Sequence, residues 1–403
     1  MTTLEATASK VQEFIALRRE LHRYPELAFE EHRTADLVAS KLAAWGYQVH
    51  RGLGGTGVVG TLKRGTCGTS GKRLGLRADM DALPITETSG RPWASLCAGR
   101  MHACGHDGHT AMLLAAAHRL SQHPGLDGTL HLIFQPAEEA GGGGGAQRMI
   151  DEGLFDRFPC DALFAMHNMP GIAQGHLHLR AGPMMASGDE VTIELKAPGG
   201  HGAMPHCTPD PIVAAAHLVT ALQTVVARNV NPQHTAVVTV GYFQAGQAYN
   251  VIPPKATLGL TVRAGDREVR RLLHERIEAL AHAQAQSFGV KAEVTWKPGY
   301  PVLVNDATQT DFAHATALSL LGSDRVVCPA SALMASEDFA FMLEQVPGCY
   351  LFIGNGDGSD GNAASACMVH NPNYDFNDDN IAVGAAYWVH LAERFLKSAG
   401  VPS

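Results

Sequence analysis

Several short segments of the sequence carry side chains that can bind a metal ion or move a proton. They place aspartate, histidine, cysteine or glutamate at the ends of predicted strands or in loops: 77–84 (RADMDALP), 102–109 (HACGHDGH), 135–139 (QPAEE), 166–168 (MHN) and 368–372 (MVHNP). Loops at the carboxyl ends of strands form the ligand crevice of an α/β sheet, so these segments can meet in one site. A single histidine is more often a hydrogen-bonded core or surface residue, and the prediction therefore depends on the whole set.

Two pairs of neighbouring residues define the expected chemistry. Cys104 and His106 are separated by one glycine, so both side chains can turn toward one centre, and thiolate and imidazole suit zinc and similar metals. Glu138 and Glu139 place two carboxylates side by side, which is costly to bury unless a cation or a proton compensates. Because neighbouring side chains point in different directions, one glutamate can bind metal while the other acts as a base toward water.

Two glycine-rich segments look like phosphate-binding motifs but lack the context of one. Residues 52–57 (GLGGTG) match G-x-G-x-x-G, yet a strand is predicted at 58–62 where a dinucleotide site needs a helix, so we expect a hairpin turn. The five glycines at 141–145 lack the Gly-Lys-Ser/Thr ending of a P-loop, and we expect a close turn before a helix at 147–152. The sequence also contains no G-x-S-x-G or H-E-x-x-H motif, which argues against the usual serine hydrolases and one-zinc proteases.

The elements that must position these residues follow from hydrophobic periodicity. Apolar residues at helical spacing predict two helices within 8–46, joined near Tyr24-Pro25. Strand and helix patterns then alternate, with strands at 58–62, 74–78 and 130–134 and a helix at about 110–120. This alternation predicts an α/β fold with a mixed, largely parallel sheet flanked by helices.

From about residue 189 the order of elements changes to β-α-β-β-α-β. The predicted elements are 191–195, 211–227, 235–242, 255–263, 268–288 and 292–296. This is the ferredoxin-like order, a compact unit that can be inserted into another domain. Segments of α/β type return at 310–321 and 349–353, before a closing helix at 379–398. We therefore predict a discontinuous metal-binding catalytic domain, residues 1–186 and 298–403, interrupted by an inserted domain at 187–297.

Composition limits the class of partner and the compartment. The chain has 403 residues and a formal net charge of −8, from 31 Lys and Arg against 39 Asp and Glu, without a basic run. We therefore expect no nucleic-acid partner and no membrane partner, and a small-molecule or peptide substrate instead. We find no signal-peptide pattern at the N-terminus and no apolar run long enough for a membrane span. The eight scattered cysteines are typical of reduced thiols and predict a cytoplasmic protein.

Eight motifs, in order between residues 77 and 378, resemble the M20 metallopeptidase family. They are RADMDALP, HACGHDGHT, FQPAEE, MHN, GGHGAMPH, NVIP, SEDF and HNPNYDFND. Within the family they look like the amidohydrolase branch of hippurate hydrolases, N-acyl-amino-acid aminoacylases and auxin-conjugate hydrolases. The resemblance covers nearly the whole chain and implies a metal-dependent exopeptidase-like catalytic domain. It also implies that the inserted α+β domain is a lid or dimerisation domain, and that the protein is a homo-oligomer, a dimer or tetramer.

The resemblance assigns roles residue by residue. It implies two divalent metal ions, zinc or else manganese, cobalt or nickel, held by Cys104, His106, Glu139, His167 and His370. Glu138 would be the general base, and His201 of the inserted domain would stabilise the oxyanion, commonly in the partner subunit's site. Asn250 and Arg263 match the positions that hold the substrate carboxylate, and a guanidinium fork fits a carboxylate geometrically.

One position departs from the wider family. Many members have a metal-binding His-x-Asp on the early strand, whereas this sequence has Asp79-Met80-Asp81 and lacks that histidine, a change that the cysteine-containing branch shares. The resemblance implies that Asp81 supports the reaction by orienting a ligand histidine or the loop that bears it. The role of Asp79 stays open.

The implied reaction is metal-dependent hydrolysis of the amide bond of an N-acyl amino acid, releasing a carboxylic acid and a free amino acid. Glu138 would remove a proton from water and pass it to the leaving amine. A dipeptidase or aminopeptidase would share the fold and metals, and a deacylase of N-acetylated diamino acids would differ only in pocket contacts. A non-catalytic metal-binding scaffold is the third alternative, although it would not need an intact base.

Overall fold

The computed structural model describes residues 10–65, 71–359 and 366–396. The chain divides into two compact units. The first contains residues 1–184, 304–331 and 338–403, and the second contains 185–303 and 332–337. The predicted domain boundaries at 187 and 298 lie close to these divisions, although residues 298–303 and 332–337, predicted in the catalytic domain, group with the second unit. The catalytic and lid or dimerisation roles of the two domains stay predictions.

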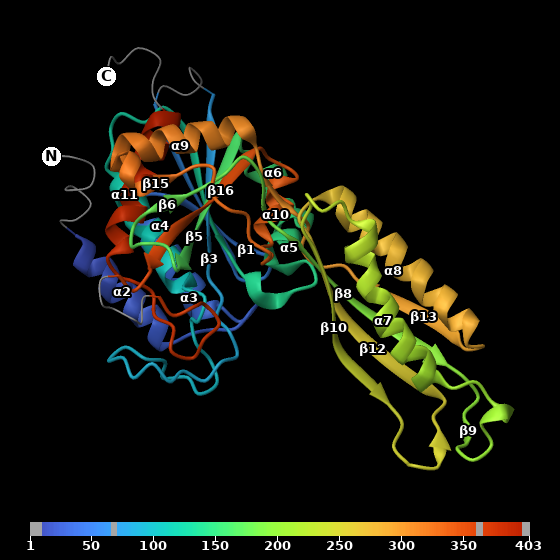
Figure 1. The fold of residues 1–403 in the computed structure, drawn as a ribbon. Helices are drawn as coiled ribbons and strands as arrows, with labels where there is room; N and C mark the ends of the chain where they lie inside the picture. Colours follow the sequence, from blue (N-terminus) through green and yellow to red (C-terminus); the bar gives the residue numbers. More distant parts are fainter. Residues whose placement is uncertain (1–9, 66–70, 360–365, 397–403) are drawn as a thin grey trace. The chain divides into compact units, whose positions relative to one another are not determined.

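The first unit is built on an eight-stranded mixed sheet with the order β1-β2-β4-β3-β5-β16-β6-β15 (Figure 1). Strands β4, β3, β5 and β16 run parallel to one another, while β1, β2 and β6 add antiparallel pairs. The strands are β1 (Gln48–Leu53), β2 (Gly57–Arg64), β3 (Arg73–Asp79), β4 (Gly128–Gln135), β5 (Ala162–Pro170), β6 (Leu177–His178), β15 (Val326–Val327) and β16 (Gly348–Gly356). The predicted mixed, largely parallel sheet is confirmed.

The central strands are buried on both faces, which explains their apolar sequences. Strands covered on both sides have nearly continuous apolar runs rather than alternation. Strand β5 is such a case, because almost all of its residues are buried, and it is not among the predicted strands. Its buried polar residues, His167 and Asn168, lie near its carboxyl end.

Helices flank this sheet. They are α2 (Val11–Arg23), α3 (His32–Ala44), α4 (His106–Ser121), α5 (Gly144–Asp151), α6 (Leu154–Arg157), α9 (Ala307–Leu321), α10 (Phe339–Leu343) and α11 (Asn380–Phe395). Helix α4 packs on β3 and against α2 and α11, so nearly all of it is buried. It begins four residues before the predicted start at 110, because His106-Asp-Gly-His contains no apolar residue to mark the helical period.

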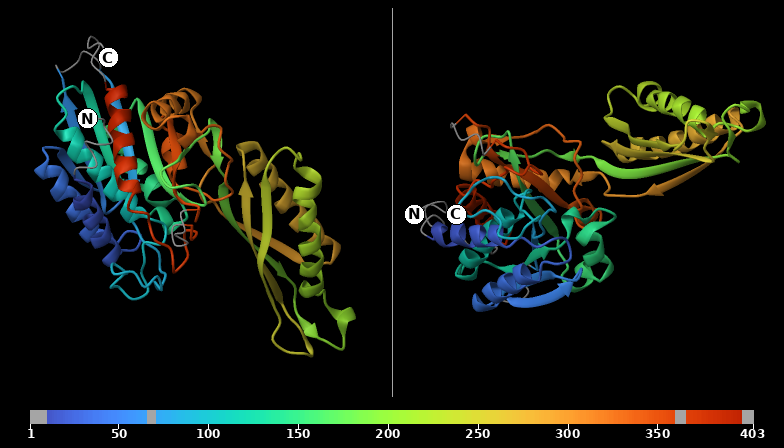
Figure 2. Two further views of the ribbon diagram at one scale, coloured as in Figure 1. Left: turned by 60° about the vertical axis from the view of Figure 1, so that its left-hand side comes forward. Right: turned by 90° about the horizontal axis from the view of Figure 1, so that it is seen from below.

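The second unit has the predicted β-α-β-β-α-β order. Its main elements are β8 (Ser187–Lys196), α7 (Pro211–Asn229), β10 (Ala236–Ala245), β12 (Lys255–Ala264), α8 (Arg267–Ser287) and β13 (Lys291–Lys297). The sheet order is β10-β12-β8-β13 and every pair is antiparallel. Both helices lie on one face of this sheet (Figure 2). A short extra pair joins β9 (Gly200–His201) to β11 (Val251–Ile252).

Helix α7 is the one helix among the described residues that is long and apolar enough to cross a membrane by length and composition. A single helix of this kind is weak evidence for a span. Ala214, Leu218 and Leu222 of α7 are buried against the sheet of the second unit, and the opposite face is exposed. Packing within the second unit therefore explains the apolar residues on one face of α7 but not those on the exposed face.

Candidate metal centre and active site

The turn between Cys104 and His106 depends on a glycine and on a buried asparagine. Gly105 has a φ of +86°, in the left-handed region that glycine adopts freely. A Cβ atom at this position would lie 2.4 Å from Asn168 Nδ2 and 2.5 Å from Tyr374 Oη, so a larger residue does not fit. The Asn168 amide donates to the Cys104 carbonyl oxygen at 2.7 Å. The turn is therefore fixed, with both side chains buried.

His106 and His167 each commit one ring nitrogen to the protein. His106 Nδ1 lies 3.1 Å from Asp81 Oδ1, and its buried Nε2 has no hydrogen-bond partner in the described part of the chain. His167 Nδ1 lies 2.6 Å from the Asn168 carbonyl oxygen, and because a carbonyl only accepts, this nitrogen carries the proton. His167 Nε2 lies 3.3 Å from Cys104 Sγ. Ligand atoms of Cys104, His106 and His167 lie within 4.8 Å of one another.

Glu139 and His370 complete a second group around the same sulfur atom. His370 Nε2 lies 3.0 Å from Glu139 Oε1, and these two residues and Cys104 have ligand atoms within 4.8 Å of one another. Glu138 and Glu139 form a further group with His106. The structure therefore brings all five predicted ligands and Glu138 into one cluster, in which Cys104 belongs to two groups.

The cluster forms where parallel strands end. Asp81 follows β3, Glu138 follows β4, and His167 lies near the end of β5. Because β3 runs parallel to both β4 and β5, the three carboxyl ends lie at the same edge of the sheet. The expected meeting of these segments at the carboxyl ends of the strands is therefore observed.

Comparison with known proteins establishes the family. Residues 75–394 match the sequence profile of peptidase family M20/M25/M40. The chain belongs to this family. A hippurate hydrolase from Campylobacter jejuni is 44% identical over 96% of this chain and 97% of its own. An N-acetyl-L-cysteine deacetylase from Bacillus subtilis is 40% identical over 96% of this chain and 89% of its own.

A solved structure is also similar to this M20 family member. It is described as a dinuclear metal-binding peptidase of the M20 family from Bacillus subtilis. The two chains are 33% identical, the TM-score is 0.82, and the match covers 96% of this chain and 99% of the other. The predicted family resemblance is therefore confirmed.

In this M20 family member, Asp79 contacts residues of the cluster and residues that surround it. Asp79 is fully buried, and its Oδ2 accepts a hydrogen bond from Arg77 Nη1 at 2.7 Å and lies 3.8 Å from His106 Nε2. Its Oδ1 lies 2.6 Å from His109 Nδ1. The backbone N–H of Asn168 donates to His109 Nε2 at 2.9 Å, so the His109 proton is on Nδ1. Both nitrogens of His109 are thus used within the protein, and His109 orients its neighbours.

The charges of the cluster favour a cation. Burial by itself would lower the pKa of His106, but the carboxylates of Asp79 and Asp81 outweigh it and raise this pKa to about 10. Burial, with the charges of Glu139 and Glu138, raises the pKa of the Cys104 thiol. Divalent cations would reverse the shift at the thiol and take the place of a proton on imidazole. The nitrogen, oxygen and sulfur donors, with the buried Nε2 atom of His106, fit such ions.

The second unit holds the other three predicted site residues. His201 lies in β9 and Asn250 directly precedes β11, and pairing of the two strands brings their backbones together. The Gly202 N–H donates to the Asn250 carbonyl oxygen at 2.7 Å. Arg263 lies near the far end of β12, whereas Asn250 lies beyond the Lys255 end. Eight residue steps of roughly 3.3 Å separate Lys255 from Arg263, about 26 Å of strand. One copy of the unit therefore does not bring Asn250 and Arg263 together.

A buried arginine that the sequence analysis missed connects the segments around the cluster. Arg18 is fully buried and bonds to Asp107 Oδ2 at 3.4 Å, Asp375 Oδ1 at 3.2 Å and Asp378 Oδ1 at 2.7 Å. Asp107 follows the predicted ligand His106 in the chain. The sequence does contain a signal for this role, because Arg18 lies on the same helical stripe as the buried Phe14 and Leu21.

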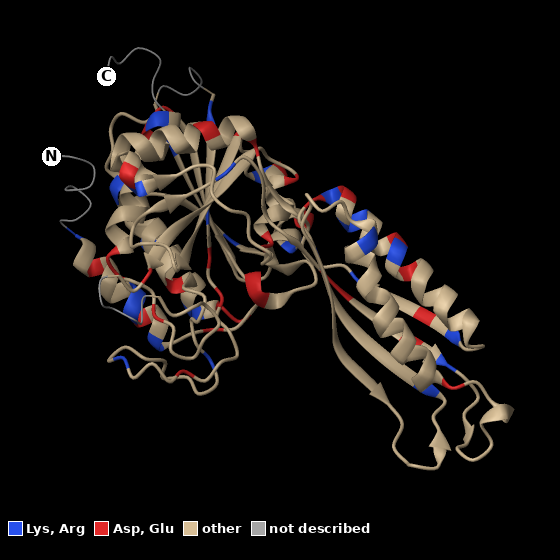
Figure 3. Cartoon of the chain, in the orientation of Figure 1, with Lys and Arg blue, Asp and Glu red and all other residues tan. Residues whose placement is uncertain are grey.

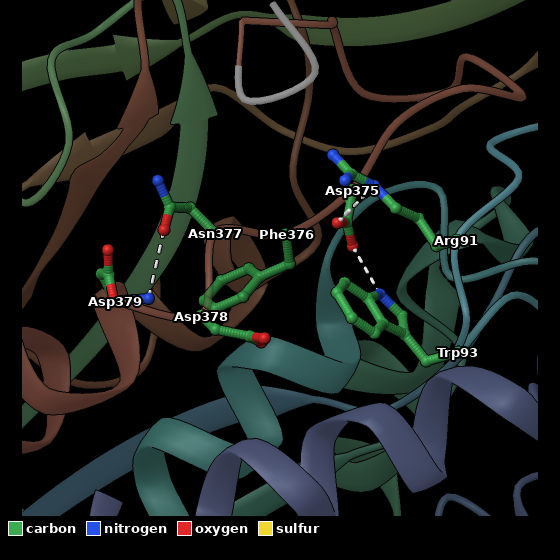
Figure 4. Close-up of a pocket in the computed structure, with 7 residues that line it drawn as sticks. All are labelled: Arg91, Trp93, Asp375, Phe376, Asn377, Asp378 and Asp379. Carbon is green, nitrogen blue, oxygen red and sulfur yellow. Dashed lines mark hydrogen bonds and ion pairs between the residues drawn. The ribbon is translucent and has the colours of Figure 1, made fainter. Parts of the chain in front are cut away.

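The loop that contains Asp375 and Asp378 also lines a pocket of about 180 Å³ (Figure 4). Its lining residues are Arg91, Trp93, Asp375, Phe376, Asn377, Asp378 and Asp379. Figure 4 shows Trp93 pointing toward Asp375, which accepts a hydrogen bond from Trp93 Nε1 at 3.1 Å. None of the five predicted metal ligands lines this pocket.

Proposed function

We propose that this chain hydrolyses the amide bond of N-acyl amino acids, such as hippurate-like substrates, and releases a carboxylic acid and a free amino acid. The observation that carries the proposal is the cluster of five nitrogen, oxygen and sulfur ligands beside the buried carboxylate of Glu138. The similarity to a hippurate hydrolase and to an N-acetyl-L-cysteine deacetylase supports this substrate class.

The ligand groups support a site for two divalent metal ions. Cys104, His106 and His167 would hold one ion, and Cys104, Glu139 and His370 would hold the other. Bound ions would polarise the amide carbonyl and make water a stronger acid. Zinc, manganese, cobalt and nickel all suit such a mixed donor set.

The residues of the chain would then move the protons. Glu138 takes a proton from the attacking water and delivers it to the amide nitrogen as the carbon–nitrogen bond breaks. Asp81 keeps the cluster in place, because it lies against His106 Nδ1 and accepts the Glu139 backbone N–H at 2.9 Å. His201 would donate to the oxyanion and Arg263 to the substrate carboxylate.

We also propose a homo-oligomer, at least a dimer, formed through the second unit. Strand β10 is an edge strand, and residues 229–254 contain no lysine, arginine, aspartate or glutamate. Figure 3 shows α7 and β10 almost free of charge, whereas α8 carries many charged residues. Ile212 of α7 and Phe243 of β10 are exposed apolar side chains that a second copy would cover. The distance between Asn250 and Arg263 agrees with residues from two subunits serving one site.

A cytoplasmic location is part of the proposal. The seven cysteines that lie in the described part of the chain are all free thiols. Free thiols fit a reducing compartment, where a thiolate ligand such as Cys104 stays available for metal.

The test combines metal analysis with a substrate screen. The purified protein should contain about two divalent metal ions per chain. It should release free amino acid from N-benzoyl-, N-acetyl- or indoleacetyl-amino acids, and a chelator should abolish this release. Glu138→Gln, loaded with the same metal, should lose at least about a hundredfold in kcat. Cleavage of dipeptides without cleavage of acyl amino acids would favour the peptidase alternative, and normal turnover by Glu138→Gln would refute the assigned base.

A further inference from the structure

The turn that carries Glu138 is held by groups from three other segments of the chain, at Glu31, Asp81 and Gly145. Ala137, the residue before it, has φ +53° and ψ +43°, a left-handed conformation that is unfavourable for a residue with a Cβ atom. Its N–H donates to Glu31 Oε1 at 2.8 Å, and its carbonyl oxygen accepts the Gly145 N–H at 2.9 Å. Both polar backbone groups of Ala137 are therefore fixed, as is the Glu139 N–H by Asp81.

Glu31 is itself immobilised. It is fully buried at the start of α3. Its Oε1 also accepts the Phe29 N–H at 3.0 Å, and its Oε2 accepts the hydroxyl of Thr56. Thr56 belongs to the glycine-rich turn 52–57 between β1 and β2, so this turn orients the carboxylate. Two further donors, the Phe29 N–H and the Thr56 hydroxyl, thus hold the Glu31 carboxylate against the Ala137 N–H.

The five-glycine run at 141–145 also holds the turn at Ala137. A Cβ atom on Gly145 would lie 1.8 Å from the Pro136 carbonyl oxygen, so only glycine lets the start of α5 approach the turn this closely. This approach gives the Gly145 N–H its bond to Ala137. The two glycine-rich segments, which lack the context of phosphate sites, therefore both serve the turn at residues 136–138.

We propose that Glu31 is a positioning residue for the reaction. Its carboxylate holds Ala137 in the left-handed conformation and so fixes the direction in which Glu138 and Glu139 leave the turn. The part that concerns Glu138 rests on the proposed function. If Ala137 returned to the right-handed region, the backbone after it would rotate, and a shift of about 1 Å at a catalytic group can cost roughly a hundredfold in rate.

The test uses variants that separate the hydrogen bond from the charge and from the backbone. Glu31→Leu removes the acceptor and should lower kcat by roughly tenfold to a hundredfold, with KM changed less than about twofold. Glu31→Gln keeps an acceptor oxygen for the Ala137 N–H and should stay within about threefold of the wild type. The double variant Glu31→Leu/Ala137→Gly should recover most of kcat, because glycine adopts this conformation without help.

The neighbouring exposed carboxylate provides the matched control. Glu30 pairs with Arg100 on the surface, and Glu30→Leu should leave kcat unchanged. Loss of activity in Glu31→Gln equal to that in Glu31→Leu would overturn the proposal, since it would mean that charge and not the hydrogen bond matters. Failure of Ala137→Gly to restore kcat would overturn it too. If urea unfolding shows that Glu31→Leu does not fold, Glu31→Ser takes its place in both comparisons.

Cobalt binding gives a readout that does not depend on turnover. Glu139 leaves the same turn, so Glu31→Leu should weaken Co²⁺ binding by roughly tenfold and reduce the thiolate-to-cobalt absorption, and Ala137→Gly should restore both. If the wild type hydrolyses no N-acyl amino acid, the proposed function fails, while the cobalt titration still tests whether Glu31 positions the turn. Unchanged kcat and unchanged cobalt affinity in a folded Glu31→Leu protein would refute the positioning role of Glu31.

Discussion

At the residue scale, the site consists of predicted metal ligands whose orientation is set by other polar residues. His106 is a good example, because Asp81 engages its Nδ1 and leaves Nε2 for a metal ion. In His167 the Asn168 carbonyl oxygen likewise engages Nδ1, so that Nε2 faces the cluster. The ligand atoms are thus chosen by hydrogen bonds that are not part of the cluster itself.

Asp81→Ala should therefore weaken metal binding without removing a ligand. We expect a loss of roughly tenfold to a hundredfold in metal affinity, because His106 and the Glu139 backbone both lose a partner. Competition with a chromophoric chelator measures this directly. Asp161→Ala is the control, since Asp161 forms an exposed ion pair with Arg73. Equal affinities of wild type and Asp81→Ala would contradict the role of Asp81.

The stability of the folded protein should depend on pH through the buried residue His22. Burial alone would lower the pKa of His22, but Asp107 at 2.8 Å and the Glu87 carboxylate outweigh burial and raise it to about 9. The raised value means that the charged form stabilises the folded protein fully below about pH 6.5, and that this contribution disappears as the pH rises through 9. The contribution amounts to at most about 3 kcal/mol.

Urea unfolding at pH 6, 7.5 and 9.5 measures this linkage. The free energy of unfolding of the wild type should fall across this range. His22→Gln, which cannot take up a proton, should show a smaller fall. Parallel curves for the two proteins would mean that His22 does not carry the pH dependence.

At the element scale, the parallel strands bring the ligands together and the surrounding helices hold the loops. Strands β3, β4 and β5 end at one edge, and α4 starts there at His106. Helix α2 contributes Arg18, which ties the start of α4 to the loop at 375–378. Segments from both ends of the chain thus stabilise the start of α4, where His106 lies.

Arg18→Met should destabilise the first unit strongly. Removal of one partner of a buried ion-pair network leaves uncompensated charges and typically costs about 3–5 kcal/mol. The neighbour Arg19 provides the matched control, because it pairs with the same Asp378 but is 39% exposed. Arg19→Met should cost less than about 1 kcal/mol. Denaturant unfolding measures the free energy of unfolding of both variants. Equal decreases in the two variants would contradict the special role of Arg18.

At the scale of the whole molecule, the question is which copy supplies which residue. His201 and Asn250 lie together on a short strand pair, while Arg263 lies far along β12. If one active site uses all three, two subunits must contribute to it. The surface of α7 and β10, which is almost free of charged residues, is the proposed contact.

Mixing two inactive variants tests this arrangement. Glu138→Gln lacks the base and His201→Ala lacks the oxyanion donor, so each protein alone should have little activity. After subunit exchange, half of the dimers are mixed and each contains one intact site, so the mixture should regain about a quarter of the wild-type activity. No gain, with exchange demonstrated by a mass-labelled subunit, would mean that His201 serves its own chain.

The sequence by itself determined the chemistry and the family. Residue types at predicted strand ends and in loops indicated which segments meet, and the family resemblance assigned the five predicted ligands and Glu138, which the structure brings together. Eight ordered motifs indicated the M20 family, which the comparison confirms. Periodicity predicted the sheet, the flanking helices and the β-α-β-β-α-β order. These features are local, because residue type, spacing and hydrophobic pattern are properties of short segments.

Only the tertiary structure decided which distant residues support the site and which do not meet. Glu31 and Ala137 are in contact although 106 positions apart, and both nitrogens of His109 are engaged by Asp79 and Asn168. Asn250 and Arg263, which motif matching assigned to one carboxylate, lie apart within a single unit. The physical reason is that a hydrogen bond depends on the positions of two groups in space. Short sequence segments contain no information about the distance between groups that the fold brings together or holds apart.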